Sequence, residues 1–427
     1  MPRFPALREL LATRDFRKLF AVRLVGQFGD GLLQASLATF VLFSPERQPD
    51  AVKVASAFAI LLLPYSVIGP FAGVFLDRWR RRNVLVRANV LKALTTVPIV
   101  LLVAVGNDGA LLGLAVLIVL GIGRFVLAGL SASLPHVVSG RDLVTANALT
   151  PTAGTIMAAV GAVVGVWLRS AVGGGDAGSQ VVLVAAIVGY LLAALIATRI
   201  GVNALGPSGE RPPQTMVGVA RGFVVGLQSL RRAPVARRAT TAVAAHRIAF
   251  GILTVGALLL VRNTFNPPTA ADAALGQFAV ITACAAAGAL LGAVLTPVGT
   301  RRFGTIPWSV AALLQAGIAG IALIALGSTL PSLPALLGGA ASIGFAGQAL
   351  KVCADTLLQR HIADDRLGRV FSLFDMVVNV CLVLGISIMA FTSPQSGQAL
   401  GMYLATGALL IGTACWYWGR QRHRLLP

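Results

Sequence analysis

Residues 73–82 read Gly-Val-Phe-Leu-Asp-Arg-Trp-Arg-Arg-Arg, and they stand between two long apolar runs. Gly73, at the end of the first run, permits a neighbouring helix to approach closely. Asp77 can accept hydrogen bonds from the N-terminus of a helix entering from the same side, where the helix dipole favours an anion. Arg78 and the three arginines that end the stretch can hold it against carboxylates or phosphate headgroups. The pattern favours a structured loop over a segment that merely carries positive charge.

The composition places the chain among membrane proteins. The chain has 427 residues, of which 56% are hydrophobic and 12% charged, and its mean hydropathy is +0.83. A soluble domain carries about 25% charged residues. The four cysteines lie apart in apolar stretches, and the sequence holds neither a His-Glu-x-x-His motif nor a Gly-x-x-x-x-Gly-Lys-Ser/Thr loop. We therefore predict no catalytic residue, no metal site and no cofactor.

Twelve apolar runs meet or approach the roughly 20 residues that a helix needs to cross a membrane. They cover about residues 19–43, 54–76, 84–105, 110–135, 143–168, 181–198, 243–261, 273–297, 306–326, 334–357, 370–391 and 399–418. With the N-terminus inside, most of the 35 lysines and arginines fall on cytoplasmic segments, so both termini are predicted to be cytoplasmic. Topology and anionic lipid headgroups then account for the net charge of +20 without a nucleic-acid partner.

The sequence divides near its middle, where the longest break between apolar runs separates six runs from six. This break predicts domains at 1–200 and 243–427, joined by a cytoplasmic linker at 201–242. Within the linker, apolar residues repeat every three or four positions at Met216, Val219, Phe223, Leu227 and Leu230. Such spacing indicates an amphipathic helix on the cytoplasmic leaflet, although an ordinary solvated linker is the alternative.

The two halves repeat short motifs at similar offsets. Gly73, Asp77 and Arg82 have the same spacing as Gly292, Thr296 and Arg301, and residues 136–141 have a counterpart in residues 361–366. Repeated six-helix halves with both termini inside are typical of transporters that work by rocking two bundles. We therefore predict an all-α membrane protein with twelve transmembrane helices in two six-helix bundles.

The loop at 73–82 resembles the loop signature of the major facilitator superfamily (MFS). Residues 23–31, 134–147 and 359–371 resemble the siderophore- and drug-exporter branch of that superfamily. The resemblance implies the MFS fold, with a central cavity lined chiefly by spans one, four, seven and ten. It also implies that the loop latches the two halves in the outward-open state, through Gly73, Asp77, Arg78, Arg81 and Arg82.

Charges inside the spans point to a coupling site. A charge at the centre of a span costs roughly 2.5–3.5 kcal/mol, so it should face a partner or a wet cavity. Asp30 and Arg124 both lie about 16 Å from the predicted cytoplasmic ends of spans one and four, so an ion pair is possible. We predict that Asp30 is the protonation site and Arg124 its partner, although a permanent structural pair is equally open. Gln27 and Gln34 can offer hydrogen bonds to a substrate, or else join helices.

Further candidates lie in other spans. Asp375 and Asn379 are one turn apart near the cytoplasmic end of span eleven, where the family resemblance implies contact with the loop latch. We predict that Asp375 meets Arg78 or Arg81. Lys351 and Asp355 are spaced to neutralise each other on one helix. Gly161 and Gly165 form a small-residue face that permits close packing of two helices.

The function predicted from these features is secondary active transport. We expect a monomer in the bacterial inner (plasma) membrane that expels a small amphipathic molecule in exchange for protons, surrounded by lipids. An importer or uniporter of a neutral solute is the alternative within transport. A membrane enzyme would have to use Asp364, Asp365 and His361, and a non-transporting sensor would need no cavity. Neither explains the repeated halves as well as a transporter does.

Overall fold

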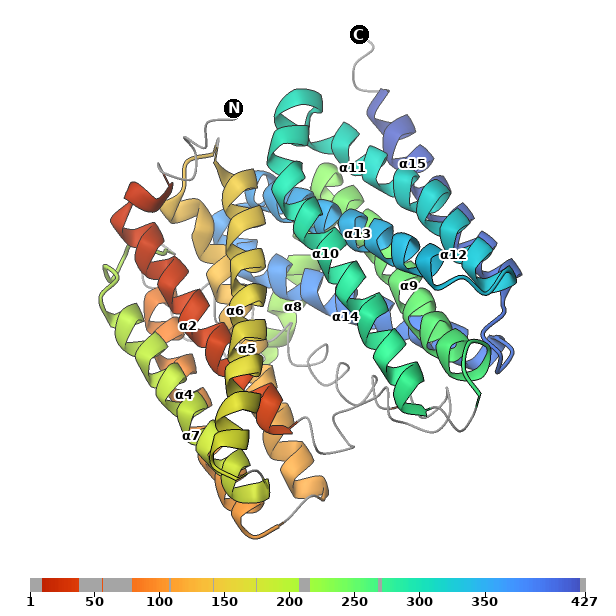
Figure 1. Cartoon of the computed structure of the whole chain (residues 1–427). Coiled ribbons are helices and arrows are strands. Elements are labelled where there is room, and N and C mark those ends of the chain that lie inside the picture. Colours follow the sequence, from red (N-terminus) through yellow and green to blue (C-terminus); the bar gives the residue numbers. More distant parts are fainter. Residues whose placement is uncertain are drawn as a thin grey trace. The chain divides into compact units, whose positions relative to one another are not determined.

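The computed structural model describes residues 10–37, 56, 79–106, 109–140, 142–173, 175–206, 216–267 and 271–422. Every regular element in these residues is a helix (Figure 1). The helices are α2 (Arg14–Leu37), α4 (Arg81–Ala104), α5 (Ala110–Val137), α6 (Leu143–Ala171), α7 (Gly175–Thr198), α8 (Met216–Arg232), α9 (Pro234–Asn263), α10 (Ala271–Phe303), α11 (Thr305–Gln315), α12 (Ile321–Thr329), α13 (Leu333–His361), α14 (Asp364–Thr392) and α15 (Leu400–Arg422). A π-helical segment, Ala316–Gly320, connects α11 to α12.

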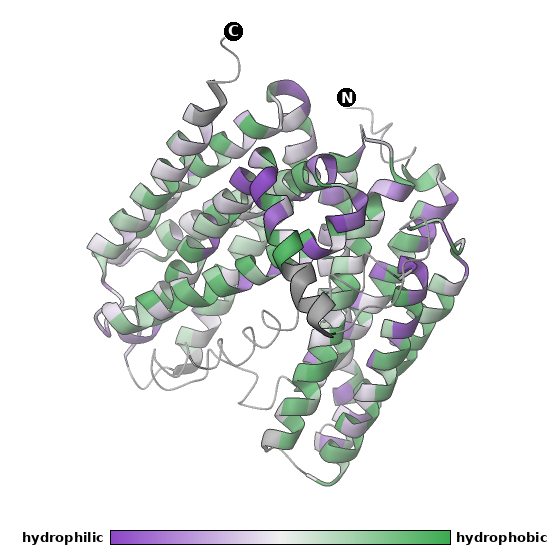
Figure 2. Cartoon of the chain, turned by 180° about the vertical axis from the view of Figure 1, so that it is seen from behind, coloured by the Kyte–Doolittle hydropathy of each residue, from purple (hydrophilic) through white to green (hydrophobic). Residues whose placement is uncertain are grey.

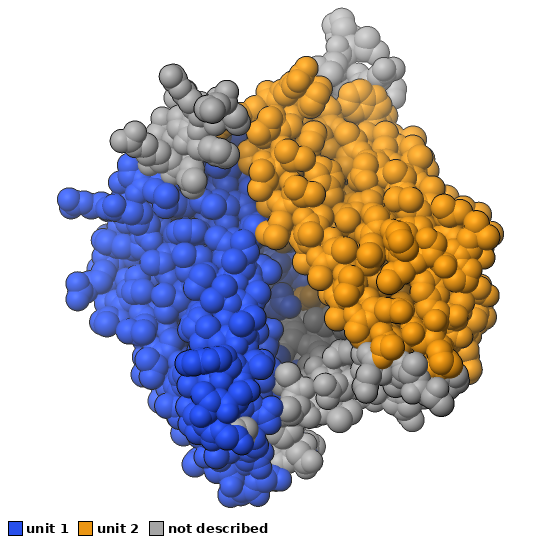
Figure 3. Space-filling view, in the orientation of Figure 1, with its two compact units in different colours: residues 1–44, 64–233, 358–376 blue, residues 45–63, 234–357, 377–427 orange. Residues whose placement is uncertain are grey.

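The chain forms two compact units (Figure 3). Unit 1 comprises residues 1–44, 64–233 and 358–376, and unit 2 comprises residues 45–63, 234–357 and 377–427. Unit 1 therefore takes in the end of α13 and the start of α14, which belong to the second half of the sequence. The predicted boundaries at 200 and 243 stay a prediction.

Ten helices among the described residues are long and apolar enough to cross a membrane. They coincide with the third to twelfth predicted runs, and hydrophobic residues cover most of their length (Figure 2). The described part of α2 is not among the ten, because polar side chains interrupt it. The second predicted run, 54–76, lies outside the described residues except for Ser56.

Close helix packing in both halves depends on glycine. A β-carbon at Gly161 of α6 would lie 2.2 Å from the carbonyl oxygen of Phe28 on α2, so these helices touch through their backbones. This confirms the predicted packing face, to which Gly165 also belongs. In unit 2, a β-carbon at Gly385 of α14 would lie 2.1 Å from the carbonyl oxygen of Ile248 on α9. The first and fifth spans of one half thus pack as the first and fifth spans of the other do.

The core of unit 1 consists of two hydrophobic clusters that follow one another along the helices. The first includes Val22, Leu85, Ala88, Val126 and Ala197, and the second includes Leu32, Ala93, Ile99, Val119 and Tyr190. Between them, α2, α4 and α5 present polar or small residues instead of large apolar ones. A polar layer therefore divides the core at mid-depth.

The predicted amphipathic helix in the linker is present as α8, Met216–Arg232. Gly226, Ser229 and Leu230 form its buried side. A β-carbon at Gly226 would lie 3.2 Å from Cβ of Arg369 on α14, so α8 packs against protein within unit 1. Its predicted place on the cytoplasmic leaflet remains a prediction.

Candidate functional site

The carboxylate of Asp30, on α2, lies at the junction of three helices. It forms an ion pair with Lys92 of α4. The hydroxyl of Tyr190, on α7, donates a hydrogen bond to the same oxygen, Asp30 Oδ1, at 3.0 Å. Lys92 Nζ also lies 4.1 Å from the centre of the Tyr190 ring, within cation–π range. We call these three residues the Asp30 cluster.

The members of the Asp30 cluster differ in exposure. The side chain of Lys92 is 2% exposed and that of Asp30 is 18% exposed, while Tyr190 is fully buried. A buried ammonium depends on its counter-ion, because a lone charge in an apolar interior costs several kcal/mol. The carboxylate is therefore the charged member that solvent can reach.

Small residues make room for the Asp30 cluster. A β-carbon at Gly29 would lie 2.9 Å from Cε1 of Tyr190, so the ring lies directly against the backbone of α2. A β-carbon at Gly123 of α5 would lie 3.5 Å from Lys92 Nζ. The ammonium thus lies beside the backbone of α5 as well as the carboxylate of α2.

The predicted pair between Asp30 and Arg124 is wrong. Asp30 pairs with Lys92, and the side chain of Arg124 is exposed. Helix α5 is rotated so that Gly123, the residue before Arg124, faces α4. Depth made Lys92 a candidate equal to Arg124, because Lys92 lies eleven residues, or about 16 Å, from the start of α4.

The two glutamines predicted to accompany Asp30 lie away from the ion pair. Gln27 Oε1 accepts a hydrogen bond from Nε of Arg23 on the same helix, at 3.3 Å. A β-carbon at Gly154 of α6 would collide with the Gln27 side chain, so this glutamine lies against α6. The side chain of Gln34 is exposed. The prediction that either contacts substrate stays a prediction.

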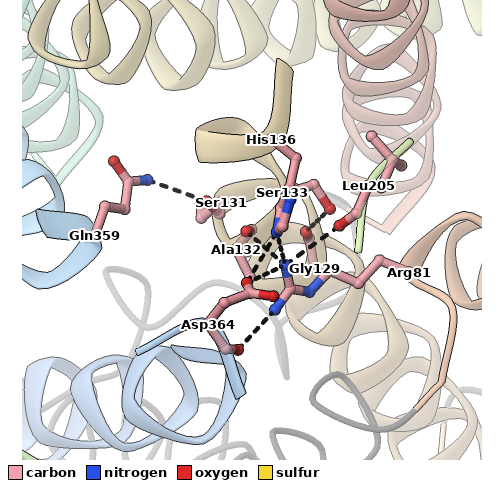
Figure 4. A network of polar contacts seen from close by, with 9 residues as sticks. All are labelled: Arg81, Gly129, Ser131, Ala132, Ser133, His136, Leu205, Gln359 and Asp364. Carbon is pink, nitrogen blue, oxygen red and sulfur yellow. Dashed lines mark hydrogen bonds and ion pairs between the residues drawn. The ribbon is translucent and has the colours of Figure 1, made fainter. Parts of the chain in front are cut away.

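A second polar network lies at the start of α4 (Figure 4). All of its residues belong to unit 1. Arg81 Nη1 lies 2.9 Å from Asp364 Oδ1, at the start of α14. Nε2 of His136, near the end of α5, lies 2.8 Å from that oxygen and 2.9 Å from Arg81 Nη1. We call these three residues the Arg81 network.

The guanidinium of Arg81 is fully buried, whereas Asp364 is 40% exposed. Arg81 Nη1 also donates to the carbonyl oxygens of Ala132 and Leu205, at 3.0 and 3.2 Å. A guanidinium only donates and an ionised carboxylate only accepts, so His136 Nε2 can serve one of them at a time. Since Arg81 has other acceptors, we assign His136 Nε2 a proton that it donates to Asp364.

Further hydrogen bonds join the same parts of the sequence. Asn147 Nδ2 donates to Gln359 Oε1 at 2.6 Å. Gln359 Nε2 donates to the carbonyl oxygen of Ser131 at 3.1 Å, as Figure 4 shows. Arg360 donates to the carbonyl oxygen of Gly140 at 2.9 Å. The end of α13 and the start of α14 are thus fastened to α5 and α6.

The structure describes only part of the predicted latch. Gly73, Asp77 and Arg78 lie outside the described residues. Arg82 donates to the carbonyl oxygen of Thr198 at 2.8 Å, at the end of α7.

Of the two predicted partners of Asp375, Arg78 lies outside the described residues, and Arg81 pairs with Asp364 instead. Asp375 lies eleven residues further along α14, about 16 Å from that end, and Asn379 lies one turn beyond it. Sequence reasoning weighed Asp364 only as a candidate for a membrane enzyme. Its place at the first turn of a helix, opposite the basic loop, was the available signal.

The predicted pair on α13 is confirmed. Lys351 Nζ lies 2.6 Å from Oδ1 and 2.7 Å from Oδ2 of Asp355, one turn further along the same helix. This pair belongs to unit 2.

Comparison with known proteins finds relatives over almost the whole chain. No family model matches. An uncharacterized MFS-type transporter of Mycobacterium tuberculosis, and one of Mycobacterium bovis, are each 35% identical over 395 residues, covering 92% of this chain and 88% of theirs.

Solved structures share the fold at low identity. A bacterial homologue of the iron transporter ferroportin, in an outward-facing state, is 15% identical, with a TM-score of 0.69 over 94% of this chain and 99% of its own. The human organic anion transporter MFSD10 is 15% identical, with a TM-score of 0.70 over 97% and 100%. The fucose:proton symporter of E. coli is 14% identical, with a TM-score of 0.58 over 93% and 96%.

Long apolar helices with an ion pair buried at mid-depth define a multi-pass membrane transporter. The relatives that are 35% identical over most of both chains show which transporter family this is. The chain belongs to the major facilitator superfamily and has its fold.

Proposed function

We propose that this transporter exports a small amphipathic molecule in exchange for protons, and that Asp30 binds the proton. The Asp30 cluster is the observation that carries the proposal. It combines a carboxylate that is 18% exposed with a lysine and a phenol from two other helices. Such a site can exchange protons with solvent and can report its charge to the surrounding helices.

The charge balance explains how proton binding would drive a conformational change. While Asp30 is ionised, its negative charge balances the positive charge of Lys92. A proton on Asp30 leaves the ammonium without a counter-ion in an apolar bundle, which raises the free energy of this helix arrangement. A different arrangement of α2, α4 and α7 then becomes favoured, as alternating access requires.

Outward transport is supported by the resemblance of residues 23–31 to exporters. In this proposal the Arg81 network, with Asp375 and Asn379 deeper in α14, belongs to the gate on the cytoplasmic side. Both termini lie on that side of the plasma membrane, and the protein acts as a monomer among lipids.

An amphipathic substrate is supported by a cavity of about 220 Å³ in unit 2. Phe250, Phe278 and aliphatic residues of α9, α10, α12 and α13 line it. The two threonines in its wall, Thr254 and Thr282, donate their hydroxyl protons to carbonyls of their own helices. This wall therefore favours an apolar part of a ligand.

A second candidate function is import or facilitated diffusion of a neutral solute. The observation that favours it is the completeness of the Asp30 cluster, because Asp30 already has a cation and a hydrogen-bond donor. A permanent structural pair would look the same, and it would leave transport independent of protons.

The test begins with ligands. Purified protein is screened by thermal unfolding with ethidium, tetraphenylphosphonium and a ferric hydroxamate siderophore, because a bound ligand stabilises the folded state. Each ligand that binds is then added to proteoliposomes loaded with the pH indicator pyranine. We expect substrate addition to move protons through the wild type, and Asp30→Asn to bind substrate without moving protons.

Asp355→Asn is the matched control, since it changes a buried carboxylate whose lysine lies on the same helix. It should keep proton movement. Substrate transport by the wild type without proton movement would support the second candidate and rule out antiport. Proton movement that persists in Asp30→Asn would rule out Asp30 as the proton site.

A further inference from the structure

Asn89, on α4, carries a buried polar atom that finds no partner. The residue is fully buried, and its Nδ2 donates to the carbonyl oxygen of Leu85 on the same helix, at 2.7 Å. Its Oδ1 accepts no hydrogen bond from the residues that the structure describes. An unsatisfied buried acceptor costs about 1–3 kcal/mol, so its retention calls for a bound donor.

This orphan oxygen lies one helical turn from the Asp30 cluster on each of three helices. A β-carbon at Gly26 of α2 would lie 3.7 Å from Asn89 Oδ1 and 3.9 Å from Cβ of Ala193 on α7. Asp30 is four residues after Gly26, Lys92 is three after Asn89, and Tyr190 is three before Ala193. The three helices meet here with a glycine and an alanine, which leave the oxygen without large neighbours.

The carboxylate of Asp30 has a free oxygen of its own. Lys92 and Tyr190 both contact Oδ1. Within the described part of the chain, no group donates to Asp30 Oδ2. One helical turn is about 5.4 Å, close to the span of two hydrogen bonds that meet at one water molecule.

We propose that Asn89 Oδ1 binds a water molecule that bridges to the carboxylate of Asp30, and that this water receives the proton when Asp30 releases it. The proposal rests on the proposed proton coupling. While Asp30 is ionised, the water donates one hydrogen to Asn89 and one to Asp30, and when Asp30 is protonated its O–H donates to the water, so in both states the water has the two partners that a buried water needs. Asn89 is a positioning residue, since its amide oxygen holds the water and does not take up the transferred proton.

The proton transfer balances simply. The O–H bond of protonated Asp30 breaks as a new O–H bond forms on the water, which then passes a proton to solvent once the site is open to it. The charged and titratable groups around this step are Lys92 from α4 and Tyr190 from α7. Helix α5 presents Gly123, and Arg23 with Gln27 lies on the α6 side of α2.

The water site is closed on the side of the first hydrophobic cluster. That cluster contains Val22, Leu85 and Ala197, one turn or more beyond Gly26, Asn89 and Ala193. Proton release toward the predicted cytoplasmic side therefore requires these helices to separate. This requirement is what antiport needs, because a continuous water path would leak protons.

Three variants test the role of Asn89. Asn89→Leu removes the acceptor at similar volume, and Asn89→Ala leaves room for additional water. Thr96→Val is the control, because Thr96 is equally buried one turn beyond Lys92 and donates only to the carbonyl of Lys92 on its own helix. Two rates are measured for each: substrate-linked proton movement, and substrate exchange across proteoliposomes at equal concentration on both sides.

We expect Asn89→Leu to slow proton movement roughly tenfold, the factor that corresponds to losing one hydrogen bond that holds the water. Exchange should stay within about twofold, because it needs no net proton release. Asn89→Ala should recover proton movement, and Thr96→Val should resemble the wild type. The proposal is overturned if Asn89→Leu matches the wild type, or if it slows both rates equally.

Infrared difference spectra between high and low pH provide a readout that is independent of transport. A bound water gives an O–H band that shifts in water labelled with oxygen-18, and this band should be absent in Asn89→Leu. If the wild type moves no protons but shows the Asn89-dependent band, the proposed function fails and the water site stands. If the band is absent from the wild type, the water site fails.

Discussion

Two buried lysine–aspartate pairs lie in different halves of the sequence. Asp30 and Lys92 belong to separate helices, whereas Lys351 and Asp355 lie one turn apart on α13. In the first pair the lysine is 2% and the aspartate 18% exposed, and in the second the lysine is 23% and the aspartate 2% exposed. Solvent thus reaches the acid of one pair and the base of the other. A pair within one helix survives any helix rearrangement, but a pair between helices does not.

The largest expected effect comes from removing one charge of the pair between helices. Asp30→Asn leaves Lys92 buried without a counter-ion, which should lower the free energy of unfolding by about 3–5 kcal/mol. Asp355→Asn should cost about 1 kcal/mol, because its lysine is partly exposed and can reach solvent. Chemical denaturation in detergent, followed by tryptophan fluorescence, measures both values. Equal losses in the two variants would contradict the distinction between the pairs.

Removing both charges sharpens the same comparison. In Asp30→Asn combined with Lys92→Met, no lone charge remains, so most of the stability lost in Asp30→Asn should return. Substrate-linked proton movement should stay absent, because no titratable acid replaces Asp30. The corresponding double variant of Lys351 and Asp355 should show a coupling energy of only about 0.3–0.5 kcal/mol. A double variant that regains proton movement would show that another residue binds the proton.

The sequence predicts the helices well because long apolar runs leave little choice in a membrane. All ten spans that the described residues contain were visible as such runs. The polarity of α2 was visible as well, and depth indicated that Asp30 needs a charge partner inside the bundle, which the structure supplies as Lys92. Depth could not choose between these two cations, since Lys92 lies eleven residues from the start of α4 and Arg124 lies eleven from the predicted cytoplasmic end of span four, about 16 Å in each case.

What decides between those two cations is the rotation of each helix about its own axis. That rotation follows from packing between helices, such as the contact of Gly123 with Lys92, and one residue of rotation turns a side chain by about 100°. The partner of Arg81 was missed for a related reason. The resemblance of the loop to a family signature implied Asp375 as a partner, whereas in the structure Arg81 pairs with Asp364, at the start of α14.

Asp364 joins two elements without being buried, so a variant of it shows how much the contact between elements contributes when burial does not. Like Asp30 it contacts another part of the chain, yet it is 40% exposed. We expect Asp364→Asn to open the Arg81 network roughly tenfold more often, equivalent to about 1.4 kcal/mol. The reporter is labelling of Thr150→Cys, a buried position on α6, by a membrane-impermeant maleimide in a cysteine-free background.

Asp365→Asn is the control for this variant. The carboxylate of Asp365, next to Asp364 in the sequence, lies 3.4 Å from Arg366 at an exposed site. Labelling should stay near the wild-type rate there. Unchanged labelling in Asp364→Asn would mean that the Arg81 network does not hold the gate. Increased labelling in both variants would mean that negative charge at this end of α14 matters more than the contact with Arg81.

The smallest effect is expected at His136. In His136→Gln the amide nitrogen can still donate to Asp364, so the variant can replace the contact that His136 Nε2 makes at 2.8 Å. Arg81 Nη1 keeps its hydrogen bonds to the carbonyl oxygens of Ala132 and Leu205. Labelling of Thr150→Cys should therefore change less than about threefold between wild type and variant. Labelling that rises as far in His136→Gln as in Asp364→Asn would show that the imidazole itself, and not the hydrogen bond to Asp364, holds the Arg81 network together.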